Sequence, residues 1–316
     1  MGNNVETDEA VQYQCPHCGA ILQAEEPIDG IHVDCPQCGG VFVATPIASV
    51  NPQTGKFPAS IKIKKWIIPL AVVVAGFVLL KALGSGPEAG TTKIITLPGG
   101  AKMAMVWCPP GKFMMGNEGY QHQVTLTKGF WMAKTEVTQL QWQSVMGTTL
   151  RQQRSKAGYE RPIVGEGDDY PMYYVNWPEA KAFCQKAGLQ LPTQAQWEYA
   201  CRAGSTGEYG GTGHWADMGW CAANSGGRTH PAGQKLPNAW GLYDMHGNVW
   251  EWCADCIEHS PRKPVTNPVG STDGEYLGRC GGSWLSPPVQ CRAGFNDGFI
   301  FGSRESFMGF RPIKIP

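Results

Sequence analysis

Two pairs of closely spaced cysteines near the start of the chain have the residue type and spacing of a metal site. Cys15 and Cys18 flank Pro-His, Cys35 and Cys38 flank Pro-Gln, and sixteen residues separate the two pairs. Each Cys-x-x-Cys turn offers two thiolates, and four thiolates complete the tetrahedral shell of Zn²⁺. So small a unit has too little core to fold without the metal. We therefore predict a zinc ribbon over residues 1–43. A pair of redox-active or disulfide-bonded turns is the alternative.

The composition of the whole chain indicates which kind of fold surrounds any further site. The 316 residues include 26 basic and 26 acidic side chains, so no bulk attraction to nucleic acid is expected. Glycine occurs 41 times and tryptophan 12 times, which favours a loop-rich fold held by buried aromatic rings over a helical bundle. The length allows one large domain beside the ribbon.

One apolar run has the length of a membrane span. Residues 66–83 are apolar except for Lys81, near the end, where a lysine can reach the interface. We predict one transmembrane helix here, with a buried core helix as the alternative. A cleaved signal peptide is disfavoured because the run begins far from the N-terminus.

Charge next to the run predicts its orientation. Lys62, Lys64 and Lys65 precede the run and place the N-terminus in the cytoplasm, which also keeps the zinc thiolates in reducing surroundings. The expected order is a linker with a basic flank (44–65), the span, a tether (84–93) and a large domain (94–316). The large domain is then extracytoplasmic, in a bacterial periplasm or at a cell surface.

Three short helices are indicated in the large domain by their ends. Thr138 with Gln141, and Thr193 with Gln196, have capping-box spacing. Pro178 suits the first turn of a third helix that runs to Lys186. We expect the remainder to be mostly short strands and irregular loops.

Segments of the large domain resemble the formylglycine-generating enzyme (sulfatase-modifying factor) family. They occur in the family's order, at residues 113–116, 134–138, 174–177, 191–199, 237–252, 281–284 and 309–311. The resemblance implies a C-type-lectin-like α+β fold with much irregular structure. Family members bind calcium after the Gly-Leu-Tyr segment. Carried over by position, the calcium ligands are the side chains of Asp244 and Glu251 and the carbonyls of Gly247 and Val249, a hard-oxygen set.

Oxidase chemistry in this family uses copper held by two cysteines. The family positions correspond here to Ser286 and Cys291, or to Pro288 for the second if Arg292 fixes the alignment. Either way the first cysteine is missing, and one thiolate cannot form a two-sulfur Cu(I) site. Copper is therefore not expected. Ser283 and Trp250 match other pocket residues of the family.

Eight cysteines in an extracytoplasmic domain predict disulfides. Cys184 and Cys201 match half-cystines of the family, whose usual partners are absent. Cys201 with Cys291 is the replacement that we expect. The remaining candidates leave several pairings open, and they are Cys253, Cys256 and Cys280.

The segment between the last two family motifs carries an unusual number of apolar residues. Exposed aromatic side chains in a loop would indicate a binding surface, and inward packing is the alternative. The expected ligand-binding residues are Leu285, Ser286, Phe295, Asp297, Phe299, Ile300, Phe301, Ser306 and Phe307. All nine belong to the set that adenine mutation of asparagine codons can reach. Targets of diversity-generating retroelements often have this fold and vary in this stretch.

These observations predict a membrane-anchored protein that displays a calcium-stabilised recognition domain outside the cytoplasm. The expected ligand is a protein or a surface glycan. A cytoplasmic partner of the zinc ribbon is a further expectation. The alternative is an oxidoreductase that converts a sulfatase cysteine to formylglycine.

Overall fold

The chain forms two units, residues Met1–Ile68 and Pro69–Pro316. The structure is a computed structural model that describes residues 86–117, 119–158, 162–256 and 263–316, and the backbone of four strands in the first unit. The predicted linker and transmembrane span lie outside these residues. None of the helices that are described is long and apolar enough to cross a membrane.

The first unit contains two antiparallel hairpins. They are formed by β1 (Val11–Gln14) with β2 (Ile21–Ala24), and by β3 (His32–Asp34) with β4 (Val41–Val43). One cysteine pair falls between the two strands of each hairpin, at residues outside the described set. The zinc site stays a prediction.

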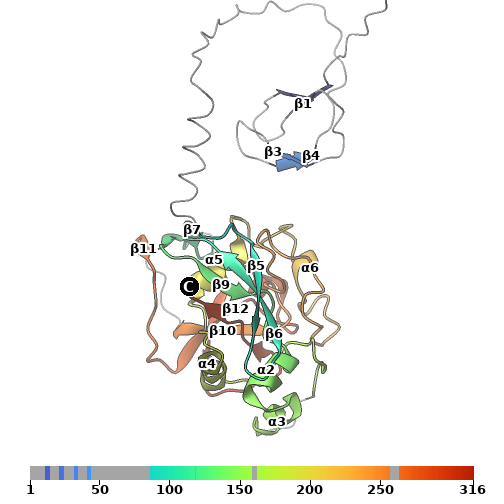
Figure 1. Ribbon diagram of the computed structural model, residues 1–316, viewed down its shortest axis with the longest axis vertical. Coiled ribbons are helices and arrows are strands. Elements are labelled where there is room, and N and C mark those ends of the chain that lie inside the picture. Colours follow the sequence, from blue (N-terminus) through green and yellow to red (C-terminus); the bar gives the residue numbers. More distant parts are fainter. Residues whose placement is uncertain are drawn as a thin grey trace, which may run out of the picture. The chain divides into compact units, whose positions relative to one another are not determined.

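Three small sheets make up the strands of the large unit (Figure 1). The first has the order β15-β9-β6-β5, with β15 (Ile313–Lys314), β9 (Phe130–Ala133), β6 (Lys102–Cys108) and β5 (Thr92–Thr96). The second has the order β11-β8-β7, with β11 (Val265–Thr266), β8 (His122–Leu126) and β7 (Gly111–Met115). The third has the order β13-β12-β10-β14, with β13 (Asn296–Ile300), β12 (Tyr276–Cys280), β10 (Trp250–Cys256) and β14 (Met308–Gly309).

The helices are short and end at clear signals. They are α2 (Gln139–Met146), α3 (Leu150–Ser155), α4 (Trp177–Lys186), α5 (Gln194–Arg202), α6 (Trp215–Met218) and the 3₁₀ turn η1 (Pro288–Cys291). The three expected helices are confirmed. Thr138 and Thr193 form the predicted capping boxes, and Pro178 lies in the first turn of α4. Because each cap satisfies orphan N–H groups locally, these helix starts are readable from sequence.

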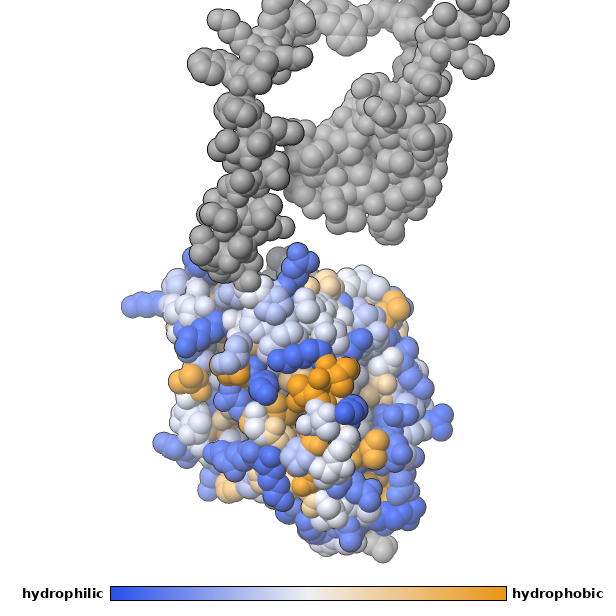
Figure 2. Space-filling view, in the orientation of Figure 1, coloured by the Kyte–Doolittle hydropathy of each residue, from blue (hydrophilic) through white to orange (hydrophobic). Residues whose placement is uncertain are grey.

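A series of buried aromatic rings connects helices α2 and α4 to the segment that follows β14. Trp142 of α2 stacks on Phe183 of α4 at 5.9 Å, and both meet Phe310 edge to face. Figure 1 shows α2 and α3 together at one end of the large unit. On its visible face, apolar residues form separate patches among hydrophilic ones (Figure 2). The abundant aromatic residues thus stabilise a unit with little regular structure, as the composition predicts.

Candidate functional site

The residues at the family's copper positions meet at a tight turn that follows β12. The Ser286 hydroxyl accepts a hydrogen bond from the Ser283 backbone N–H at 3.1 Å and lies 3.1 Å from the Ser283 hydroxyl. The Cys291 thiol packs against Gly282, where an added Cβ would come within 2.4 Å of the sulfur. The same turn therefore contacts Ser286 and Cys291. The carbonyl of Pro288 instead accepts from the Tyr209 hydroxyl.

This site offers one neutral thiol and two hydroxyl groups. Burial raises the pKa of the Cys291 thiol far above its usual value, so the thiolate is scarce at neutral pH. Cys221 lies with Cys291 and Tyr209 in a small buried cluster. This second thiol was missed in the sequence because Cys221 is 70 residues away and belongs to no motif.

Large side chains close the site. Trp250 and Trp284 are 3% and 9% exposed, and the Trp284 indole N–H donates to the carbonyl of Ser306 at 3.1 Å. Ser283, Ser286 and Cys291 are buried as well. None of them lines any of three cavities found among the described residues.

The predicted calcium ligand Glu251 is already satisfied by protein groups. Its carboxylate forms a buried ion pair with Arg311, whose Nη2 lies 2.7 Å from Oε1, and it accepts from the Trp197 indole at 2.6 Å. Calcium binding through Glu251 would require Arg311 to move. Glu251 does not fit the role that its position implies.

Asp244 and the unpredicted Glu136 have unused oxygen atoms instead. Asp244 accepts from the Gly233 N–H through Oδ2, whereas its Oδ1 and both carboxyl oxygens of Glu136 are buried with no partner other than the opposite carboxyl group. Burial is the largest cause that raises the pKa of Asp244, to about 6, and that of Glu136 well above its usual value. Among the described residues, no group of three or more His, Cys, Asp or Glu side chains could hold a metal ion. A cation here would depend on two carboxylates and on backbone carbonyls, for which Gly247 and Val249 are the predicted donors.

The nine expected ligand-binding residues divide between surface and core. Leu285, Ile300 and Phe301 are exposed by 55%, 49% and 41%. Ser286 and Ser306 are buried, so the expectation that they line an open surface is wrong. The other four are partly buried, and they are Phe295, Asp297, Phe299 and Phe307.

Arg279 of β12 explains why two of the phenylalanines point inward. Its guanidinium lies over the rings of Trp250, Phe299 and Phe307, at 4.5, 4.3 and 5.8 Å. It also donates from Nε to Asp297 at 3.2 Å. Cation–π contacts and packing therefore hold the segment on the sheet. The alternative of inward packing is correct for these rings.

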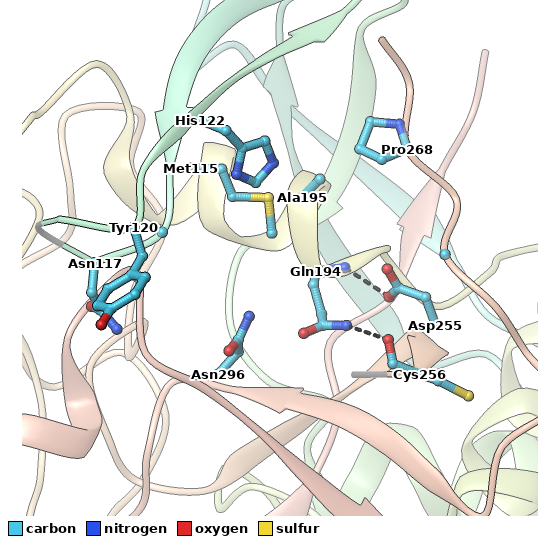
Figure 3. Close-up of a pocket in the computed structure, with 13 residues that line it drawn as sticks. Met115, Asn117, Tyr120, His122, Gln194, Ala195, Asp255, Cys256, Pro268 and Asn296 are labelled. Atoms are coloured by element: carbon cyan, nitrogen blue, oxygen red, sulfur yellow. Dashed lines mark hydrogen bonds between the residues drawn. The ribbon is translucent and has the colours of Figure 1, made fainter. Parts of the chain in front are cut away.

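A cavity of about 260 Å³ opens beside the start of β13 (Figure 3). His122, Gln194 and Asn296 supply polar groups from three different elements. Gln194 donates from its side chain to the Cys256 carbonyl and from its backbone to Asp255, each at 2.9 Å. Burial lowers the pKa of His122, which keeps the imidazole neutral near pH 7. The cavity thus offers neutral hydrogen-bonding groups beside the carboxylate of Asp255. The remaining lining residues are Met115, Gly116, Asn117, Tyr120, Ala195, Pro268, Gly270 and Gly294.

Cys201 and Cys291, the predicted disulfide pair, are not bonded to each other, and all eight cysteines of the described residues are free thiols. Both residues are free and buried. The imidazole of His246 contacts both, with Nε2 at 3.7 Å from the Cys201 sulfur and Nδ1 at 2.8 Å from the Cys291 carbonyl. Cys291 instead belongs to the small buried cluster that contains Cys221.

Comparisons with known proteins agree with this geometry. Residues 94–315 match the model of the sulfatase-modifying factor enzyme 1-like domain. The formylglycine-generating enzyme of Mus musculus is 35% identical over 141 residues, which are 39% of this chain and 37% of that enzyme. This chain thus spans well under half the length of that relative.

Two solved structures share the fold. Treponema denticola variable protein 1 is 28% identical with a TM-score of 0.62, covering 73% of this chain and all of that one. PvdO from Pseudomonas aeruginosa is 26% identical with a TM-score of 0.59 and the same coverage.

Proposed function

The chain belongs to the sulfatase-modifying factor enzyme 1-like family, and we propose that it uses the family's fold to bind a ligand, without oxidase activity. Ser286 at the first copper position is the observation that carries the proposal. Its hydroxyl is a hard ligand, already hydrogen-bonded to Ser283, and it cannot replace a thiolate on Cu(I). The closed surroundings of Cys291 support the same conclusion.

The binding surface in this proposal is the exposed part of residues 285–307 with the adjoining cavity. Leu285, Ile300 and Phe301 offer apolar contact area, and Asn296 lines the cavity from the same segment. Such side chains on a rigid support suit a protein or a surface glycan as the ligand. The underlying contacts of Arg279 hold this surface in one conformation before the ligand arrives.

We place this domain outside the cytoplasm, tethered by residues 66–83, with the zinc ribbon on the cytoplasmic side. The apolar run and its flanking lysines support the placement. A cytoplasmic partner of the ribbon completes the proposal. We propose that the bound cation is calcium and that Asp244 is its main carboxylate ligand.

Diversification of residues 285–307 is a separate part of the proposal. The similarity to a protein named as variable supports it, as does the codon set of the nine positions. An adenine-rich near-copy of this coding stretch beside a reverse transcriptase gene is the expected finding. A genome without both would contradict diversification and leave ligand binding untouched.

Cys221 is the observation that favours the rival, an oxidase. It lies in one cluster with Cys291 and supplies a second thiol near the family site. The full chain is therefore tested for oxidation of a cysteine in a sulfatase-derived peptide, with O₂ and Cu(I) supplied. We expect no aldehyde product from the wild type or from Cys221→Ser. Product from the wild type that disappears in Cys221→Ser would establish the rival.

A further inference from the structure

Two cysteines on neighbouring central strands lie in van der Waals contact. The Cys253 sulfur on β10 is 3.7 Å from the Cys280 sulfur on β12, and both side chains are buried. The pairing of β10 with β12 is antiparallel and places Glu251 opposite Cys280. Because side chains alternate along a strand, Cys253 shares the face of Glu251 and thus of Cys280.

An irregularity in β10 accounts for this approach. The register of β10 on β12 shifts between Trp252 and Cys256, which is the signature of a β-bulge. A bulge bends its strand and re-aims the side chains within it. Cys253 follows directly after the last regular pair, so its sulfur meets a residue that is diagonal in the ladder.

The other candidate cysteines have different surroundings. The Cys256 sulfur accepts from the Gly274 N–H at 3.2 Å, and Cys201 contacts the carbonyl of Met245 and the ring of His246. Neither of these two cysteines is held by a contact with another sulfur, whereas Cys253 and Cys280 contact each other. The pairings that the sequence leaves open are thereby reduced to one.

We infer that Cys253 and Cys280 become joined by a disulfide when the domain folds in oxidising surroundings. The inference rests on the proposed extracytoplasmic placement for its occurrence in the cell, and on the contact alone for its geometry. The bond would fasten β10 to β12, and these strands carry Trp250 and Arg279 beneath the proposed binding surface.

The step exchanges one disulfide for another. A thiolate from one cysteine attacks a protein or low-molecular-weight disulfide and releases one donor thiolate. The second cysteine, as thiolate, then displaces the donor's remaining sulfur. Two cysteine thiols lose two protons and two electrons in total, and the donor disulfide is reduced to two thiols.

Burial limits when this can happen. Desolvation is the main cause that raises the pKa of both thiols in the folded domain. A donor has no access to sulfurs that are 0% and 2% exposed. The bond therefore forms during folding, before α5 covers the sheet, and resists reduction afterwards.

The test is peptide mapping of the full chain, refolded with a mixture of oxidised and reduced glutathione and alkylated after denaturation. Trypsin releases residues 236–262, which hold Cys253 and Cys256, and residues 280–292, which hold Cys280 and Cys291. We expect these two peptides to be linked before reduction. The link should persist in Cys256→Ser and Cys291→Ser and disappear in Cys253→Ser and Cys280→Ser.

Cys184 provides an internal control because it is buried and its tryptic peptide, 182–186, contains no other cysteine. It should be fully alkylated without reduction. Absence of the link, or its persistence in Cys253→Ser or Cys280→Ser, would overturn the inferred pair.

The same mapping on chains alkylated inside intact cells separates the pair from its location. We expect the link there too. A link in the refolded chain and free thiols in cells would leave the pair intact and contradict the extracytoplasmic placement.

Discussion

Arg311 and Glu251 form a fully buried ion pair at the centre of the large unit, with Nη2 and Oε1 2.7 Å apart. The two residues belong to separate family motifs, 60 positions apart, so the pair joins the segment just before β15 to β10. The same arginine donates to the carbonyls of Ala133 and Tyr243. One side chain thereby connects three distant segments of an otherwise irregular fold.

Removing one partner of this pair is expected to destabilise the domain strongly. Arg311→Met leaves the Glu251 carboxylate buried without its counter-charge, which costs about 3–5 kcal/mol in comparable sites. Urea unfolding measures the change. Arg151→Met is the matched control, because its ion pair with Glu166 is exposed and the substitution should change the free energy of unfolding far less. Equal effects of both variants would contradict the central role of the buried pair.

Glu136 and Asp244 predict an unusual pH dependence when a chelator keeps metal away. Both pKa values are raised in the folded state, mainly by burial, so the folded chain binds more protons than the unfolded chain. Stability should then fall as pH rises from about 4 through 6, by roughly 1–3 kcal/mol. Glu136→Gln should flatten this dependence. A stability that rises over the same interval in wild type would contradict the prediction.

Calcium should reverse that penalty, because the cation binds the deprotonated carboxylates. Adding calcium at pH 7.5 is expected to raise the Tm of the wild type, and Asp244→Asn should reduce the shift. Glu198→Gln is the control, since that buried carboxylate pairs with Arg202. A calcium shift that survives in Asp244→Asn would place the ion elsewhere.

The exposed and the inward-packed residues of the proposed binding surface should differ in how much they contribute to stability. Phe301→Ala and Leu285→Ala remove exposed side chains and are expected to change stability by less than about 0.5 kcal/mol. Phe299→Ala removes a ring that packs on Trp252 and Arg279, and should cost about 2–3 kcal/mol. Thermal unfolding of the three variants compares them. Similar losses for Phe301→Ala and Phe299→Ala would mean that Phe301 is part of the core.

Arg279→Met is expected to loosen residues 295–307 without unfolding the domain. The methionine keeps apolar contact with the rings but loses the cation–π contacts and the ion pair with Asp297. Hydrogen exchange of this segment should become faster than that of α5. Unchanged protection would show that ring packing alone holds the segment.

Local signals were readable from the sequence, and distant contacts were not. Thr138 and Thr193 announce their helices within four residues, but Thr149 and Gln152 form the same capping box ahead of α3. That helix was missed because its polar sequence has no apolar face to suggest packing. The family motifs predicted the fold of residues 94–316.

The chemistry of the site depended on contacts that no motif states. Glu136 faces Asp244 from 108 positions away, and Cys221 approaches Cys291 from 70. Phe299 and Phe307 look like surface aromatics in sequence, because the guanidinium that holds them belongs to another strand. Sequence alone cannot tell such a loop from an exposed one when the same residue types serve both purposes.

Cu(I) affinity tests the central claim most directly. The full chain competes with a Cu(I)-specific chelator, beside Ser286→Cys and a variant in which Cys15, Cys18, Cys35 and Cys38 are all changed to serine, which removes the ribbon thiols from the count. Without the ribbon thiols, we predict that the large unit takes up no stoichiometric copper and that adding Ser286→Cys creates one site. Stoichiometric copper that depends on Cys291, in a chain that retains Ser286, would contradict the proposed lack of oxidase activity. It would instead support a copper-dependent oxidase.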